Sequence, residues 1–119
     1  MSETNKVLVV EDEALIAMLL EEVLDDLGYR VVAHASSVLE GVGLAGSVEA
    51  DVAILDVNLG GSTVFPVAER LAQRGIPFIF STGYGAHGIP REWIDWPVIS
   101  KPFTPETLAA ALAKVLSAD

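Results

Sequence analysis

Three acidic residues and one lysine follow apolar runs that are far apart in the sequence. Glu11 and Asp12 come after the first run, Asp56 after a central run, and Lys101 after the last run. If these runs are neighbouring parallel strands, their carboxyl ends meet at one edge of a sheet. Crowded carboxylates raise one another's pKa or recruit a cation, and hard oxygen ligands select Mg²⁺ or Mn²⁺.

The same residue types favour a carboxylate that accepts a phosphoryl group. Phosphoryl transfer needs an in-line nucleophile and positive charge around the phosphoryl oxygens. Asp56 is the candidate nucleophile, because it ends the central run and enters a loop with Gly60 and Gly61, where the backbone can approach closely. Lys101 and the hydroxyl of Thr82, which follows the fourth run, are the candidate donors to the phosphoryl oxygens.

Five short runs rich in β-branched residues predict the strands that must position these side chains. Two of the runs are continuously apolar, which is typical of parallel strands buried on both faces. We therefore expect an α/β fold with a five-stranded parallel sheet and helices on both faces. We adopt the strand order 2-1-3-4-5, because in that order strands one and three are neighbours at the point where the order reverses. The predicted strands are residues 6–10, 29–33, 52–55, 77–80 and 97–99.

The segments between the strands carry helical periodicity. The first helix has an acidic outer face and is followed by Gly28, and its apolar stripe consists of Ile16, Leu20, Val23, Leu24 and Leu27. The third helix is expected to use Ser62 or Thr63 as its N-cap and to stop at Gly75. Thr104 is the expected N-cap of the last helix.

The two remaining helices are predicted to be short. Residues 37–48 contain three glycines, each of which costs a helix about 1 kcal/mol relative to alanine. Residues 84–95 contain two glycines and Pro90, so we expect no more than one or two helical turns near residues 90–95.

Composition limits the classes of function. A length of 119 residues predicts one domain spanning 1–119, and a formal net charge of -10 disfavours binding to nucleic acid or to anionic membranes. The absence of cysteine excludes disulfides and thiolate metal sites. With no apolar stretch of signal-peptide or membrane-spanning length, we expect a cytoplasmic protein.

Over essentially its whole length the sequence resembles the response-regulator receiver domains of two-component signalling. The resemblance depends on an acidic pair after strand one, an aspartate after strand three, a hydroxyl residue after strand four and a Lys-Pro pair after strand five. These positions are Glu11, Asp12, Asp56, Thr82, Lys101 and Pro102.

The resemblance implies a role for each of these residues. Asp56 would take a phosphoryl group from the phosphohistidine of a sensor histidine kinase or a histidine phosphotransfer protein, and Thr82 and Lys101 would contact the phosphoryl oxygens. It also implies a cis peptide bond before Pro102. The implied Mg²⁺ ligands are Asp12, Asp56 and the main-chain carbonyl of Asn58, with Glu11 helping directly or through water.

The sequence departs from the family pattern in the switch region, which we assign to Tyr84, Val98 and Pro102. Receivers usually carry Tyr or Phe where this chain has Val98, so the resemblance does not extend to the usual aromatic switch. The segment around Tyr84 resembles a subclass named for a Phe-Ala-Thr-Gly-hydrophobic-Tyr motif. The copy is imperfect, because Ser81 replaces the alanine and Tyr84 directly follows Gly83.

The leading hypothesis is therefore a signalling switch rather than an enzyme. Phosphorylation of Asp56 would change the surface of strands four and five and the last helix, acting on an effector in trans or passing the phosphate on. One alternative is a phosphohydrolase of the haloacid-dehalogenase type, although Asn58 cannot act as the general acid that a second aspartate supplies. The other is a flavodoxin-like nucleotide binder, although the acidic loop after strand one would repel phosphate.

Overall fold

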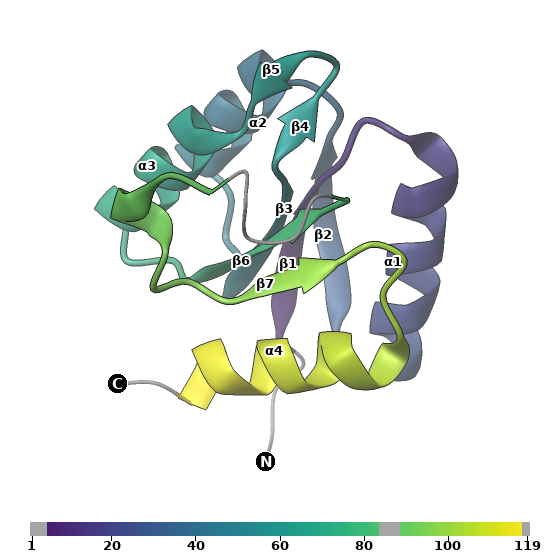
Figure 1. Ribbon diagram of the computed structural model, residues 1–119. Helices are drawn as coiled ribbons and strands as arrows, with labels where there is room; N and C mark the ends of the chain where they lie inside the picture. Colours follow the sequence, from purple (N-terminus) through teal and green to yellow (C-terminus); the bar gives the residue numbers. More distant parts are fainter. Residues whose placement is uncertain (1–4, 84–88, 118–119) are drawn as a thin grey trace.

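The computed structural model describes residues 5–83 and 89–117 and has a parallel sheet at its centre (Figure 1). The sheet has five strands in the order β2-β1-β3-β6-β7, which confirms the predicted order 2-1-3-4-5. Two further short strands, β4 and β5, pair with each other in a separate hairpin after β3. The strands are β1 (Lys6–Val10), β2 (Arg30–Ala35), β3 (Val52–Asp56), β4 (Asn58–Leu59), β5 (Ser62–Thr63), β6 (Phe78–Thr82) and β7 (Val98–Ser100).

Helices cover both faces of the sheet (Figure 1). They are α1 (Ala14–Asp26), α2 (Val38–Ala45), α3 (Phe65–Gln73) and α4 (Pro105–Ser117). Apolar residues of α1 and α4 share one buried cluster with one face of the sheet, and those of α2 and α3 share a second cluster with the other face. No helix in the described part of the chain is long and apolar enough to cross a membrane.

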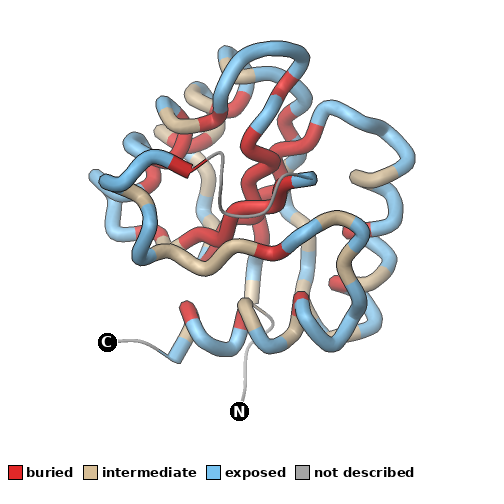
Figure 2. The backbone as a smooth tube through the Cα atoms, in the orientation of Figure 1, coloured by how far each residue is buried: buried red, intermediate tan, exposed pale blue. Residues whose placement is uncertain are grey.

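The central strands form the buried middle of the molecule (Figure 2). All five residues of β3 and all five of β6 are buried, and β1 is buried after its first residue. This explains why their sequences are continuously apolar, since each strand contacts helices on both faces. Polar residues follow as soon as the strands leave the two clusters, so the carboxyl edge of the sheet is where charged groups gather.

Several strands extend beyond their predicted ends. β6 continues through Ser81 and Thr82, and β2 continues through His34 and Ala35. Backbone pairing does not require an apolar side chain, and Ser81 pairs with Asp56 on β3 and with Ile99 on β7. Apolar patterning therefore located the strands but ended them too early.

The start of α3 was predicted wrongly. Ser62 and Thr63 form strand β5 instead of capping the helix, and Val64 occupies the N-cap position without a side-chain hydrogen bond. The Val64 N–H donates to the Val57 carbonyl oxygen at 3.0 Å, which ties the hairpin to β3 before the helix begins. The first helical turn contains a proline, which needs no hydrogen-bond acceptor there.

The other helix predictions agree with the structure. In α1, Leu20 and Leu24 are buried, and in α4 the Thr104 hydroxyl accepts the Thr107 N–H at 3.1 Å. α2 is shorter than residues 37–48. Within residues 89–97, the described part of the segment before β7, the structure has one 3₁₀ turn, η2 (Arg91–Trp93).

Two glycines of α2 differ in what surrounds them. A Cβ on Gly41 would lie 2.9 Å from Val67 Cγ2 in the packed interface with α3, whereas nothing lies within 4 Å of a Cβ on Gly43. We expect Gly41→Ala to lower the free energy of unfolding by about 1–2 kcal/mol, because the overlap with a stiff β-branched side chain exceeds the gain in helix propensity. Gly43→Ala should raise it by up to about 1 kcal/mol. Urea denaturation measures both, and shifts of equal sign and size would contradict this packing.

Candidate functional site

The ends of two neighbouring strands bring the predicted carboxylates together. Glu11 follows β1 directly, Asp56 is the last residue of β3, and β1 pairs with β3 in the sheet. One oxygen from each of Glu11, Asp12 and Asp56 lies within 4.8 Å of the others. Glu11 and Asp56 are buried, while Asp12 is exposed, so the cluster opens toward solvent on one side.

Lys101 reaches this cluster from the far strand. Its ammonium Nζ lies 3.0 Å from Glu11 Oε1 and 3.4 Å from Asp56 Oδ1, and 3.9 Å from Glu13 Oε1. A buried carboxylate without a partner is strongly unfavourable, and the ammonium provides that partner to two of them. The structure therefore joins Glu11, Asp56 and Lys101 into one ion cluster, as the sequence predicted.

The crowding changes the protonation equilibria. Burial and the negative charge of Glu11 raise the pKa of Asp56 to about 7, although the positive charge of Lys101 opposes the change. Burial alone would lower the pKa of Lys101, but its hydrogen bond to Glu11 and the charges of Asp56 and Glu11 outweigh burial and raise it. The lysine therefore stays protonated, and Asp56 is the group of this cluster that titrates near neutral pH.

The loop after β3 lies against one side of the cluster and contacts its carboxylates. The Gly60 N–H donates to Asp12 Oδ2 at 2.9 Å, and the positive φ of 56° at Gly60 is a backbone conformation that favours glycine. The Asn58 N–H lies 3.4 Å from Asp56 Oδ1. Asn58 Oδ1 accepts the Gly61 N–H at 3.2 Å, so this side chain organises the loop.

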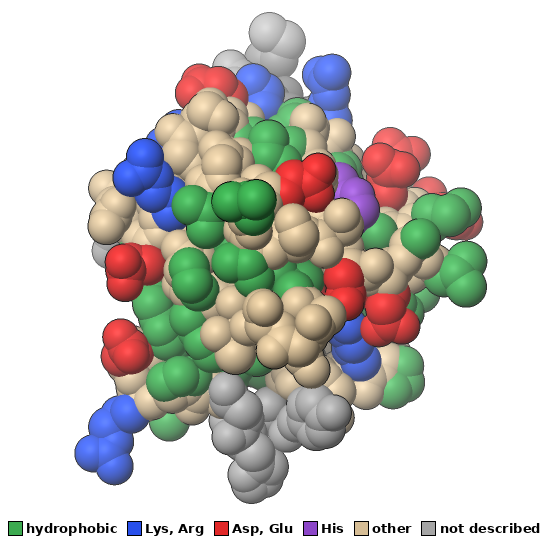
Figure 3. All heavy atoms as spheres, turned by 90° about the horizontal axis from the view of Figure 1, so that it is seen from above, with side chains coloured by type: hydrophobic (Ala, Val, Ile, Leu, Met, Phe, Trp, Pro, Cys, Tyr) green, Lys and Arg blue, Asp and Glu red, His purple; other side chains and the backbone are tan. Residues whose placement is uncertain are grey.

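An open hollow lies over these groups. Its lining includes Asp12, Asp56, Asn58, Gly83 and Lys101. Seen from above the sheet, acidic side chains lie beside a basic side chain on this face of the molecule (Figure 3). A small anion or a metal ion can therefore reach Asp56 from solvent.

The structure describes three of the four remaining predicted residues. Thr82 is buried at the end of β6, and its carbonyl oxygen accepts the Lys101 N–H at 2.9 Å. Val98 is half-buried against the cluster that contains Trp93 and Trp96. The peptide bond between Lys101 and Pro102 is cis, as the family resemblance implied, and Pro102 itself is exposed. Tyr84 lies outside the described residues.

Sequence reasoning missed two contributors to the cluster. Glu13 adds a third carboxylate near Lys101, and the His34 ring Nε2 lies 2.9 Å from the Glu11 carbonyl oxygen. Glu13 belongs to the same acidic run as Glu11, so its position in the sequence was a usable signal. His34 is on the neighbouring strand β2, and nothing in the sequence pattern pointed to this contact.

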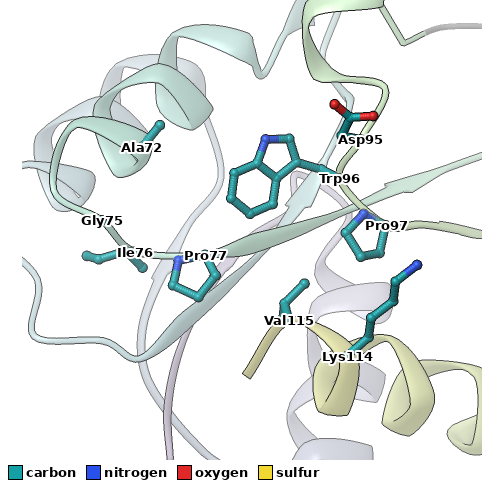
Figure 4. Close-up of a pocket in the computed structure, with 9 residues that line it drawn as sticks. All are labelled: Ala72, Gly75, Ile76, Pro77, Asp95, Trp96, Pro97, Lys114 and Val115. Atoms are coloured by element: carbon teal, nitrogen blue, oxygen red, sulfur yellow. The ribbon is translucent and has the colours of Figure 1, made fainter. Parts of the chain in front are cut away.

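A second cavity lies at the opposite, amino edge of the sheet (Figure 4). Its lining is mainly apolar and includes Pro77, Trp96 and Val115, and its two charged residues are Asp95 and Lys114. The Trp96 ring stacks on Phe78 with 4.0 Å between ring centroids, which fixes one wall of the cavity. Asp95 is the one acidic residue of this lining, whereas the lining of the hollow above Asp56 includes the carboxylates of Asp12, Glu13 and Asp56.

The raised pKa of Asp56 predicts how stability depends on pH without added metal. Between about pH 4 and pH 7 the folded protein keeps a proton that the unfolded chain releases, so the free energy of unfolding falls as pH rises through this range. Asp56→Asn stays neutral and should be more stable than the parent protein by about 1–2 kcal/mol at pH 8, with no difference near pH 4. Urea titrations at both pH values with a chelator present measure this, and a loss of stability in Asp56→Asn at pH 8 would contradict it.

Comparison with known proteins places this chain in one family. The family model of the response regulator receiver domain matches residues 7–113. The sequence is 32% identical over 119 residues to the phyllosphere-induced regulator PhyR of Methylorubrum extorquens, covering 94% of this chain and 43% of that protein. The chain spans about half the length of the curated relatives that it matches.

Solved structures agree with this relationship. SdrG from Sphingomonas melonis Fr1 is 44% identical with a TM-score of 0.86, covering 98% of this chain and 99% of that chain. A BeF3-activated conformation of SdrG gives a TM-score of 0.80. The anti-anti-sigma factor PhyR from Bartonella quintana is 27% identical with a TM-score of 0.83, covering 98% of this chain and 49% of that chain. The chain belongs to the family of response regulator receiver domains.

Proposed function

We propose that Asp56 is the phosphoacceptor of a two-component relay and takes a phosphoryl group from the phosphohistidine of a sensor histidine kinase or histidine phosphotransfer protein. The observation that carries this proposal is the position of the Lys101 ammonium, 3.4 Å from Asp56 Oδ1 and 3.0 Å from Glu11 Oε1. A buried carboxylate beside a fixed cation, under an open hollow, suits a nucleophile that receives a charged group from solvent.

The donor atoms at the site fit Mg²⁺, and Mn²⁺ has the same preference for oxygen ligands. Three carboxylate oxygens within 4.8 Å of one another carry more negative charge than one lysine balances. The residues that would hold the ion are Glu11, Asp12, Asp56 and the carbonyl of Asn58. When bound, the ion would neutralise charge on the phosphoryl oxygens and on the carboxylates.

Each residue of the site has its own role in the proposed reaction. An ionised oxygen of Asp56 attacks phosphorus, the new O–P bond forms as the N–P bond of phosphohistidine breaks, and the leaving imidazole takes up a proton. Lys101 and Thr82 would contact the phosphoryl oxygens, the first with its charge and the second with its hydroxyl. The pKa of about 7 for Asp56 means that transfer in the absence of metal should speed up as pH rises toward 7.

The partner is proposed to act in trans. SdrG, which this chain matches over almost the full length of both chains, has a BeF3-activated conformation, and beryllofluoride has the tetrahedral shape and charge of a phosphoryl group. The Bartonella relative is named an anti-anti-sigma factor, so a regulatory protein is the class of effector that we favour over a purely phosphate-shuttling role. The cytoplasm is the expected location.

The proposed switch cannot use the aromatic ring common in the family. Val98 occupies its position and packs against the cluster that contains Phe80 and Trp93, on the face of the sheet covered by α2 and α3. We propose that phosphorylation changes the surface formed by β6, β7 and α4 without that ring, with Tyr84 and Pro102 as further members of the switch region.

Phosphorylation at Asp56 can be tested directly. Acetyl phosphate with Mg²⁺ should add one phosphoryl group of about 80 Da, seen by intact-protein mass spectrometry and removed by hydroxylamine, which cleaves acyl phosphates. Asp56→Asn should remove the label completely, because an amide is not a nucleophile here. Val98→Ala is the matched control and should keep parental labelling, since Val98 lies on the other face of the sheet. Persistent labelling of Asp56→Asn would place the phosphoacceptor elsewhere.

Metal binding can be tested on the unphosphorylated protein. Millimolar Mg²⁺ should raise the melting temperature at pH 8 by several degrees, as expected for a ligand that binds only the folded state. Asp12→Asn should lose most of this rise, because it removes a carboxylate of the cluster. Asp25→Asn removes the same charge from the exposed outer face of α1 and should keep the rise in melting temperature caused by Mg²⁺. An equal rise in melting temperature in Asp12→Asn and Asp25→Asn would argue against the proposed Mg²⁺ ligands.

A further inference from the structure

Ser81 is a buried hydroxyl residue that the proposed chemistry does not yet use. Its side chain is 1% exposed, and Oγ has no hydrogen-bond partner within residues 5–83 and 89–117. A buried hydroxyl without a partner costs about 1–3 kcal/mol, and few buried polar atoms in folded proteins are in this state. An alanine of nearly the same size would avoid this cost, so the hydroxyl needs a physical reason to be there.

The register of the sheet places Ser81 in the face that carries the ion cluster. Ser81 pairs with Asp56 on β3 and with Ile99 on β7, and paired residues of parallel strands point to the same side. Ile54 and Ile99 belong to the buried cluster beneath α1 and α4. Ser81 therefore continues this cluster at the polar edge of the sheet, next to Asp56.

The path of the Lys101 side chain brings it to Ser81. Lys101 follows β7, yet its ammonium contacts Asp56 on β3 and Glu11 after β1. β6 lies between β7 and β3 in the sheet, so the lysine side chain must extend across β6. On the face that carries the ion cluster, Ser81 is the β6 residue that pairs with Asp56. The lysine side chain therefore passes over the small side chain of Ser81.

We propose that Ser81 is a positioning residue that acts through Lys101, an inference that depends on the proposed phosphorylation of Asp56. An ammonium has three N–H donors, and in this structure two carboxylates, Glu11 and Asp56, lie within hydrogen-bonding range of it. When a phosphoryl group is transferred to Asp56, the ammonium turns to the phosphoryl oxygens and its contact with Asp56 Oδ1 is lost. Ser81 Oγ then accepts an N–H from Lys101 and holds the ammonium in its new position.

This hydrogen bond should affect the rate of phosphoryl transfer without stabilising the unphosphorylated protein. It does not exist in the unphosphorylated protein, so removing the hydroxyl costs no stability there. It forms as charge moves onto the phosphoryl oxygens, and interactions made only at that stage accelerate the transfer. Ser81→Ala should therefore be at least as stable as the parent protein but should react with acetyl phosphate at least about 10-fold more slowly, the effect of one hydrogen bond to a charged group.

The experiment measures three quantities on Ser81→Ala, Ser81→Cys and the control Ser100→Ala, a serine that is exposed on β7. These are the labelling rate with acetyl phosphate at saturating Mg²⁺, the rise in melting temperature caused by Mg²⁺, and the rise caused by beryllofluoride with Mg²⁺. We expect both Ser81 variants to label slowly and to gain less from beryllofluoride, with an unchanged response to Mg²⁺ alone. The thiol fills the space of the hydroxyl and is somewhat larger, but it accepts hydrogen bonds only weakly, so Ser81→Cys separates hydrogen bonding from the loss of side-chain volume.

Each other outcome overturns the inference. Parental labelling in Ser81→Ala would show that the hydroxyl does not position Lys101. A slow Ser81→Ala with a parental Ser81→Cys would assign the effect to packing, and a weaker response to Mg²⁺ alone would assign it to the metal ligands. If the parent protein itself is not labelled, the proposed function fails instead, so the two failures are distinguishable.

Discussion

The ion pairing of Lys101 with Glu11 and Asp56 is the interaction on which the rest of the site depends. Two buried carboxylates at the ends of adjacent strands repel each other, and desolvation makes each charge more unfavourable. The ammonium that reaches them comes from beyond the edge strand β7 and crosses β6. The site therefore exists only when the strands are assembled in this order, with the carboxyl ends at one edge.

The positive charge of Lys101 does not fully balance the negative charge of the carboxylates around it. Burial and Glu11 still raise the pKa of Asp56 to about 7, which means that the folded protein stores unfavourable electrostatic energy at this carboxyl group. A divalent cation or a proton would relieve it. The orphan hydroxyl of Ser81 is a second unfavourable feature of the same face of the sheet. Such local departures from good packing and pairing are typical of functional sites, where a ligand or a later state supplies the missing partner.

The rest of the fold keeps this polar edge in place. Two apolar clusters bury both faces of β1, β3 and β6, and the hairpin of β4 and β5 holds the loop whose Gly60 N–H binds Asp12. The face covered by α2 and α3 is filled by aromatic contacts, with Phe78 between Trp93 and Trp96. Val98 packs on that face. The proposed switch would therefore have to act through packing around Val98 instead of an aromatic ring at that position.

The sequence by itself located the strands, the helix faces and three residues of the ion cluster, because apolar periodicity and the positions of Glu11, Asp56 and Lys101 after strands are local properties. It placed Thr104 correctly as a helix cap for the same reason. It assigned Ser62 and Thr63 to a cap because they precede an apolar helical pattern, and only the tertiary structure showed that they pair with β4. Tertiary structure also decided what depends on distances between strands: the pKa of Asp56, the contact of His34 with Glu11, and the lack of a partner for Ser81. Burial and neighbouring charge are fixed by chain segments that are remote in sequence, so no local pattern contains them.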